Sequence, residues 1–176
     1  MTGITAQTLE ILEKLQTTDA VFCTYSRLGP LINNFAQINP NVVHIDRPLM
    51  EVAVKSGPKI LVAICLESTR EATLALLNDR AKETEDPTSI EVIMCEAAWP
   101  YFDAGDMTAF SAEIDRAICE AIDQENTPDC IALAQASLGV ATDVLTDIGM
   151  PILSSAMLAM QRLLTAAKTS PEISII

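Results

Sequence analysis

The sequence predicts an α/β fold in which parallel sheets are covered by helices on both faces. First, short apolar runs alternate along the chain with longer amphipathic stretches, as in successive βαβ units. Second, residues 59–65, Lys-Ile-Leu-Val-Ala-Ile-Cys, are apolar almost throughout, as expected of a strand buried on both faces of a parallel sheet. Third, 49% of the 176 residues are hydrophobic, which is enough for a sizeable core and too much for a disordered chain.

The predicted strands are short, and turn residues precede several of them. Asn39 and Pro40 come before the second apolar run, and Gly57 and Pro58 come before the third; such residues interrupt regular structure. The predicted strands are residues 19–23, 42–45, 59–65, 90–95, 130–134 and 151–154.

The amphipathic stretches are predicted as helices. Pro48 lies in the first turn of one, where proline is tolerated, and Ser68 or Thr69 is expected to cap the next. Met157 and Met160 are expected in the core, on the last helix. The predicted helices are residues 5–15, 29–38, 48–57, 68–82, 108–123, 137–148 and 156–168.

Composition excludes several classes of protein. Eleven Lys and Arg against 24 Asp and Glu give a net charge of −13, which argues against a nucleic-acid partner because phosphate backbones require basic side chains. The sequence has no apolar stretch of about 18 residues, so no membrane helix is expected. Residues 1–10 do not resemble a secretory signal, which predicts a cytoplasmic protein. Glycine-rich phosphate-binding motifs are missing, so no nucleotide cofactor is expected.

The five cysteines are widely spaced, and their odd number argues against a disulfide framework. Without a CxxC pair, and with His44 as the only histidine, no metal site is expected. His44 lies in an apolar run and is interpreted as a residue at the core edge; a thiol hydrolase using Cys23 and His44 is a further alternative. The cysteines are Cys23, Cys65, Cys95, Cys119 and Cys130.

Polar residues gather where the predicted strands end. Ligands of open parallel sheets bind beyond the carboxyl ends of strands, and Cys23, Cys65 and Cys95 all fall there. Hydroxyl groups and free N–H groups at helix N-termini form anion sites, which predicts a small carboxylate as ligand. The alternative is that the hydroxyl residues only cap helices. The clusters are Thr24-Tyr25-Ser26, Ser68-Thr69 and Gln135-Ala136-Ser137.

Taken together, these segments resemble the Asp/Glu/hydantoin racemase superfamily, which includes arylmalonate decarboxylase and maleate isomerase. Residues 19–30, Asp-Ala-Val-Phe-Cys-Thr-Tyr-Ser-Arg-Leu-Gly-Pro, resemble the segment that carries the family's first catalytic cysteine. Residues 64–69 resemble the strand end that begins the second half of the family fold. Residues 129–137 resemble the segment with the second catalytic cysteine. The resemblance covers nearly the whole chain.

The resemblance implies two pseudo-symmetric, flavodoxin-like halves with the active site between them. Residues 1–48 and 150–176 would form the first half and residues 49–149 the second. The first half would lack a strand–helix–strand unit that family members carry before the helix near Thr5. Three alternatives remain open: the chain is a shortened member, its start is misplaced, or a partner chain, as in a homodimer, covers the exposed sheet edge.

In two-base members of the family, one cysteine removes the proton next to a carboxylate and the other returns a proton from the opposite face. Here Cys23 matches the first cysteine, but Gln135 stands at the second position, and an amide is neither acid nor base at useful pKa. The implied function is a cofactor-independent racemisation, isomerisation or decarboxylation by one cysteine, with Cys65 as a remote candidate for a second thiol. The alternative is a non-catalytic carboxylate-binding relative. The residues expected to bind substrate are Thr24, Tyr25, Ser26, Ser68, Thr69, Gln135, Ala136 and Ser137.

Overall fold

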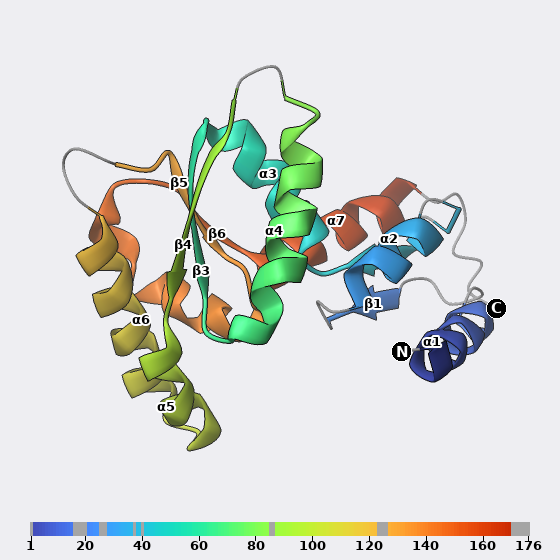
Figure 1. Cartoon of the computed structure of the whole chain (residues 1–176), viewed down its shortest axis with the longest axis horizontal. Coiled ribbons are helices and arrows are strands. Elements are labelled where there is room, and N and C mark those ends of the chain that lie inside the picture. Colours follow the sequence, from blue (N-terminus) through green and yellow to red (C-terminus); the bar gives the residue numbers. More distant parts are fainter. Residues whose placement is uncertain are drawn as a thin grey trace.

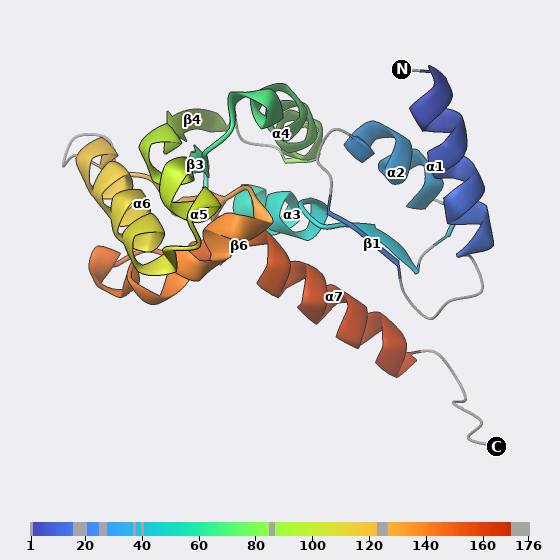
Figure 2. The same ribbon diagram turned by 90° about the horizontal axis from the view of Figure 1, so that it is seen from below.

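The computed structural model describes residues 2–15, 21–24, 28–36, 38–39, 41–84, 87–122 and 127–169. Within them lie a four-stranded and a two-stranded parallel sheet, side by side, with helices α3, α4 and α7 between them (Figures 1 and 2). The predicted class, α/β with parallel sheets, is confirmed. Tyr25 and Ser26, two of the predicted binding residues, lie outside the described residues.

The larger sheet contains β3 (Lys59–Ile64), β4 (Ser89–Met94), β5 (Cys130–Leu133) and β6 (Ile152–Ser154) in the order β4-β3-β5-β6. Every neighbouring pair is parallel. From β3 the chain first moves outward to β4 and then crosses back to β5 on the other side of β3. The strand order therefore reverses between β3 and β5, and such a switch point is where open α/β sheets bind ligands.

Strand β3 is buried on both faces, as its apolar run predicts. Ile60, Val62 and Ile64 pack on the side of α3 (Arg47–Ser56) and α4 (Glu67–Ala81). Leu61 and Ala63 face the opposite side, where α6 (Met107–Ala121) supplies most of the cover. Because successive strand residues point to opposite faces, one apolar run contributes to two separate cores.

Short helices complete the second face of the larger sheet. They are η2 (Glu96–Ala98), α5 (Trp99–Asp103), η3 (Ala136–Asp143) and η4 (Thr146–Ile148). The last two lie where one helix is predicted over residues 137–148: the stretch is helical and ends at Gly149, but it is divided in two and of the 3-10 type. Gly139 disfavours a continuous α-helix, and the Thr142 hydroxyl donates to the Gly139 carbonyl across 2.7 Å, which supports the tighter turn.

The smaller sheet pairs β1 (Val21–Cys23) with β2 (Val42–His44) in parallel. Helices α1 (Thr2–Lys14) and α2 (Gly29–Ala36) belong to this part of the molecule, and Leu12 and Ile32 bring their apolar faces to its core. This core is a separate cluster from the two that cover the larger sheet.

Helix α7 (Ser155–Thr169) follows β6 and extends away from the larger sheet (Figure 2). Met157 and Met160 are each 52% exposed, so the prediction that they lie in the core is wrong. The buried face of the helix contains Ala159 instead, and Leu158 packs against the α3 side of the core. Strand β6, which precedes α7, pairs with β5 in the larger sheet.

One buried hydrogen bond joins the two places where the chain crosses between the sheets. Asp46 lies between β2 and α3, and Ser155 directly follows β6. The Ser155 hydroxyl donates to Asp46 Oδ1 across 2.7 Å, and the two residues are 0% and 2% exposed. Farther out, Arg162 of α7 contacts Glu51 of α3 at 3.0 Å. Polar contacts therefore join the segment between β2 and α3 to the segment that follows β6.

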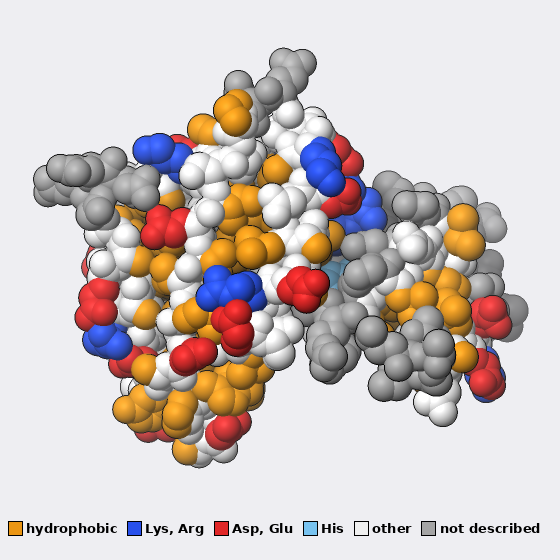
Figure 3. All heavy atoms as spheres, in the orientation of Figure 1, with side chains coloured by type: hydrophobic (Ala, Val, Ile, Leu, Met, Phe, Trp, Pro, Cys, Tyr) orange, Lys and Arg blue, Asp and Glu red, His pale blue; other side chains and the backbone are white. Residues whose placement is uncertain are grey.

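Charged side chains on the surface stand largely in pairs of opposite sign. Arg116 bonds both Glu113 and Glu120 on α6, and Arg70 bonds Glu67 on α4. Figure 3 shows basic side chains beside acidic ones on the face that it displays. None of the helices within the described ranges has both the length and the apolar composition needed to cross a bilayer.

Replacing Ser155 by alanine should destabilise the fold, because the buried Asp46 carboxylate loses the Ser155 hydroxyl as a hydrogen-bond donor. We expect a loss of about 1–3 kcal/mol in the free energy of unfolding, measured by urea titration. Thr165→Ala is the matched control, because the Thr165 hydroxyl is exposed on α7, where it donates to the Gln161 carbonyl. A Ser155→Ala loss no larger than that of the control would contradict this role for the bond.

Candidate active site at the strand switch point

The ends of β3 and β5 meet at the switch point of the larger sheet. Ala63 is the register partner of Leu133, and the Ala134 N–H donates to the Ala63 carbonyl across 3.1 Å. This register carries Gln135, the next residue, to the backbone that leaves β3. Residues that are about 70 positions apart in the sequence therefore share one site.

The side chain of Gln135 forms hydrogen bonds with the backbone just beyond the last pair of β3 and β5. Its Oε1 accepts hydrogen bonds from the backbone N–H of Cys65 at 2.5 Å and of Leu66 at 3.2 Å. Leu66 is the N-cap of α4 and has no side-chain cap of its own. The Gln135 amide therefore satisfies donors next to the start of α4, where a ligand anion would otherwise be expected to bind.

The hydroxyl residues at the start of α4 do not have the predicted role of N-cap. Ser68 and Thr69 lie inside the first turn, after the true N-cap Leu66. The Thr69 hydroxyl donates to the Leu66 carbonyl across 2.7 Å, while Ser68 is exposed. The prediction of a cap was wrong because the helix begins earlier than the first hydroxyl residue.

The residues after Gln135 open a 3-10 helix. Gln135 is its N-cap and is extended, with φ −144° and ψ 140°. Ala136 is exposed and Ser137 is partly buried. The structure therefore brings Ser68, Thr69, Gln135 and their neighbours to one edge of the larger sheet, as the sequence predicts.

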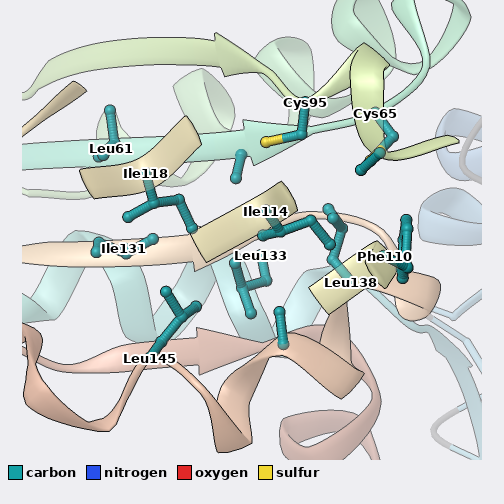
Figure 4. Packing of buried hydrophobic residues seen from close by; sticks show 13 residues of the cluster. Leu61, Cys65, Cys95, Phe110, Ile114, Ile118, Ile131, Leu133, Leu138 and Leu145 are labelled. Atoms are coloured by element: carbon teal, nitrogen blue, oxygen red, sulfur yellow. The ribbon is translucent and has the colours of Figure 1, made fainter. Parts of the chain in front are cut away.

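The thiols at this edge are buried. Burial raises the pKa of Cys65 to about 12, with a smaller contribution from the Cys95 charge. Burial also raises the pKa of Cys95 to about 11, with a smaller contribution from Glu113. Figure 4 shows both cysteines among the packed side chains that cover the larger sheet. Cys65 is accordingly a poor acid–base group at neutral pH in this structure.

The other two cysteines near the larger sheet, Cys130 and Cys119, differ from each other in exposure. Cys130 is fully buried, and burial raises its pKa to about 11. Cys119 is exposed on α6 and bonds Asp115 of the same helix. Among the described residues, no three His, Cys, Asp or Glu side chains converge as metal ligands.

Cys23 lies at the carboxyl end of β1, in the smaller sheet. It is partly buried and packs against the apolar cluster of Leu12, Ile32, Phe35 and Val42. Its carbonyl accepts from the Ile45 N–H at 2.9 Å. His44, 2% exposed, is its register partner on β2, so the two residues of the hydrolase alternative are neighbours across the strand pair.

Thr24 follows Cys23 and is exposed. Each sheet thus carries predicted site residues at a strand carboxyl end, with Cys23 and Thr24 on the smaller sheet and Gln135 on the larger. What the sequence analysis did not predict is the bond from the Gln135 amide to the backbone after β3, because strand order is not visible in a single sequence. Its only signal was the position of a polar amide directly after a buried strand.

No protein-family model and no curated protein sequence matches the chain, but solved structures do. One is a glutamate racemase from Bacillus anthracis, 14% identical, with a TM-score of 0.66 over 94% of this chain and 65% of that one. Another is an arylmalonate decarboxylase variant in a sulfate-associated form, 16% identical, with a TM-score of 0.57 over 97% and 77%. A third is an aspartate racemase from Picrophilus torridus, 17% identical, with a TM-score of 0.54 over 72% and 53%.

The chain shares its fold with these two racemases and the decarboxylase. The resemblance seen in the sequence is thereby confirmed at the level of fold, which is what a likeness at such low identity shows. The chain spans 65% of the length of the glutamate racemase and 53% of that of the aspartate racemase. The likeness concerns the fold, and the reactions named for the racemases and the decarboxylase belong to those proteins.

The buried thiols predict that the protein loses stability in alkali. Cys65, Cys95 and Cys130 have raised pKa values in the folded state, whereas thiols of the unfolded chain ionise near pH 8.5. The unfolded state therefore loses protons first, and the free energy of unfolding should fall between about pH 9 and pH 11, by at most about 1.4 kcal/mol per pH unit and thiol.

Urea titrations at pH 7, 9 and 10 measure this effect. Cys65→Ala should make the fall with pH clearly shallower, whereas Cys119→Ala should change it less, because partial burial and Asp115 raise the pKa of this exposed thiol by a smaller amount. Equal slopes in these two variants would show that the buried thiols are not its cause.

Proposed function

We propose that this chain is a cofactor-independent enzyme that transfers protons next to a carboxylate, with Cys23 as its only acid–base thiol. The observation that carries the proposal is the position of Cys23 at the carboxyl end of a parallel strand in a fold shared with racemases and a decarboxylase. Racemisation, isomerisation and decarboxylation are the reactions that fit. The substrate is a small carboxylate.

The chemistry that we assign to Cys23 is the removal or delivery of one proton. A thiolate is accessible near neutral pH when N–H or hydroxyl donors surround it. The negative charge that develops next to the carboxylate would be held by donors at the strand ends. The groups proposed to bind substrate are Thr24, Tyr25, Ser26, Ser68, Thr69, Gln135, Ala136 and Ser137.

The assignment of a single thiol is supported by the opposite strand end. Gln135 stands where the sequence resemblance places the second cysteine, and its Oε1 already bonds the backbone at the end of β3. The nearest thiol on that side, Cys65, is kept protonated by its burial. Proton transfer on both faces of a substrate by two thiols is therefore not part of the proposal.

A second candidate function is binding of a small carboxylate without turnover. The apolar cluster against which Cys23 packs favours it, because an apolar environment disfavours a thiolate. In that case a dicarboxylate should raise the melting temperature of the protein, and Cys23 should react with iodoacetamide no faster than the exposed Cys119.

Replacing Cys23 by alanine tests the enzyme proposal. Wild-type protein in heavy water should exchange the α-proton of a suitable acid or decarboxylate it, followed by proton NMR with L-glutamate, L-aspartate, maleate and phenylmalonate. Removal of the acid–base group should lower the rate by about 10²–10⁴-fold. Cys119→Ala is the control and should keep the wild-type rate.

Unchanged turnover in Cys23→Ala would contradict the assigned mechanism. Absence of turnover in the wild type, together with stabilisation by malonate, would favour the binding protein.

A further inference from the structure

We propose that Gln135 is a fixed hydrogen-bond donor that selects a carboxylate or carbonyl oxygen of the ligand at the carboxyl end of β5. The inference rests on the proposed function for the location of the ligand, and it adds a role for this one side chain. It is carried by the two backbone bonds to Oε1, the partial exposure of Gln135 and the buried floor beneath it.

The orientation of the amide is determined by its partners. The N–H groups of Cys65 and Leu66 converge on a single atom of the Gln135 side chain. Both are donors, so this atom must be the acceptor oxygen, and the alternative amide orientation would set the NH₂ group against two N–H groups. The NH₂ group therefore points away from the backbone that follows β3.

The amide nitrogen retains its capacity to donate. Among the residues that the structure describes, none accepts a hydrogen bond from Gln135 Nε2, and the residue is partly exposed. Nε2 is not one of the buried polar atoms without a partner, so solvent reaches it. A ligand at the strand end would find two N–H donors there and no free acceptor on this side chain.

The surroundings strengthen these donors. Ala134, Leu138 and Cys65 lie next to Gln135 and are 0%, 0% and 1% exposed. Hydrogen bonds beside such a water-poor floor are electrostatically stronger than in bulk water. Since Oε1 is held by two bonds, little conformational freedom remains to be lost when a ligand binds.

The ligand chemistry follows from this polarity. Carboxylate and carbonyl oxygens accept hydrogen bonds, whereas an ammonium group only donates them. A neutral amide also adds no negative charge near a bound carboxylate, in a protein whose net charge is already −13. Gln135 therefore binds an acceptor group. Being neutral, it repels neither a positively nor a negatively charged group elsewhere on the ligand.

Gln135→Glu is the most informative variant. It is nearly isosteric and keeps an oxygen for the N–H groups of Cys65 and Leu66, but it replaces the outward donor by a negatively charged acceptor. The melting temperature of the free protein should therefore stay the same or rise. Malonate binding, measured by isothermal titration calorimetry at pH 7.5, should weaken by roughly tenfold or more, as expected for the loss of one charge-assisted hydrogen bond.

Gln161→Glu is the matched control, because it adds the same charge at an exposed position on α7. It should bind malonate within about twofold of the wild type. A second measurement uses the unmodified protein: in a ¹H–¹⁵N spectrum, the side-chain NH₂ signals of Gln135 should shift when malonate is added, and those of Gln161 should not. This readout keeps the proposal testable even where Gln135→Glu fails to fold.

Two results would overturn the inference. One is a Gln135→Glu variant that binds malonate as tightly as Gln161→Glu does. The other is a wild-type protein in which malonate, maleate and L-glutamate all leave the Gln135 NH₂ signals unmoved. Loss of binding in Gln135→Glu without any proton exchange by the wild type would uphold the role of Gln135 and reject the enzyme proposal, so the two proposals fail separately.

Discussion

The pairing of β3 with β5 is the constraint on which the larger sheet and the candidate site both depend. It places the most apolar strand at the centre of the order β4-β3-β5-β6, where helices cover both faces. It also fixes the register that carries Gln135 to the backbone of Cys65 and Leu66. A shift of one residue would turn the apolar side chains of β5 to the opposite faces and separate the amide from its donors. The apolar packing on both faces of the larger sheet therefore fixes the position of Gln135 relative to Cys65 and Leu66.

Local pattern predicted the elements, but it did not predict their partners. The apolar run of β3 and the alternation of strands with helices were sufficient for the fold class, because burial on both faces leaves a continuous apolar signature. Predictions failed where a distant contact decides. Ser68 was predicted to cap α4, yet the N–H of Leu66 at the start of that helix bonds the side chain of Gln135. The exposed face of Met157 has ordinary helical spacing, and sequence alone does not show which face of α7 meets α3.

Asp46 illustrates the same limit at the crossings between the sheets. In the sequence it precedes Arg47 and Pro48 and has the form of an N-cap, but its side chain makes no cap bond and instead accepts from Ser155. The apolar clusters of the two sheets are separate, so the relation between the sheets depends heavily on contacts of α3 and α7. Both crossings run through this one buried pair. The pair also lies close to both candidate strand ends: the Ser155 hydroxyl lies 3.3 Å from the Leu133 carbonyl at the end of β5, and Ile45, the neighbour of Asp46, donates to the Cys23 carbonyl.

An acidic protein that binds acids cannot rely on its net charge for attraction. Several of its basic side chains are already engaged: Arg116 and Arg70 bond carboxylates on their own helices, and Arg162 bonds Glu51. Under the proposed function, recognition of a carboxylate would then fall to neutral donors held in place by the fold. Such donors are effective only where their direction is fixed, and at the end of β5 two backbone hydrogen bonds fix the direction of the Gln135 amide. The Gln135 oxygen accepts from the backbone, and the amide nitrogen is therefore the atom of this side chain that we propose donates to a ligand.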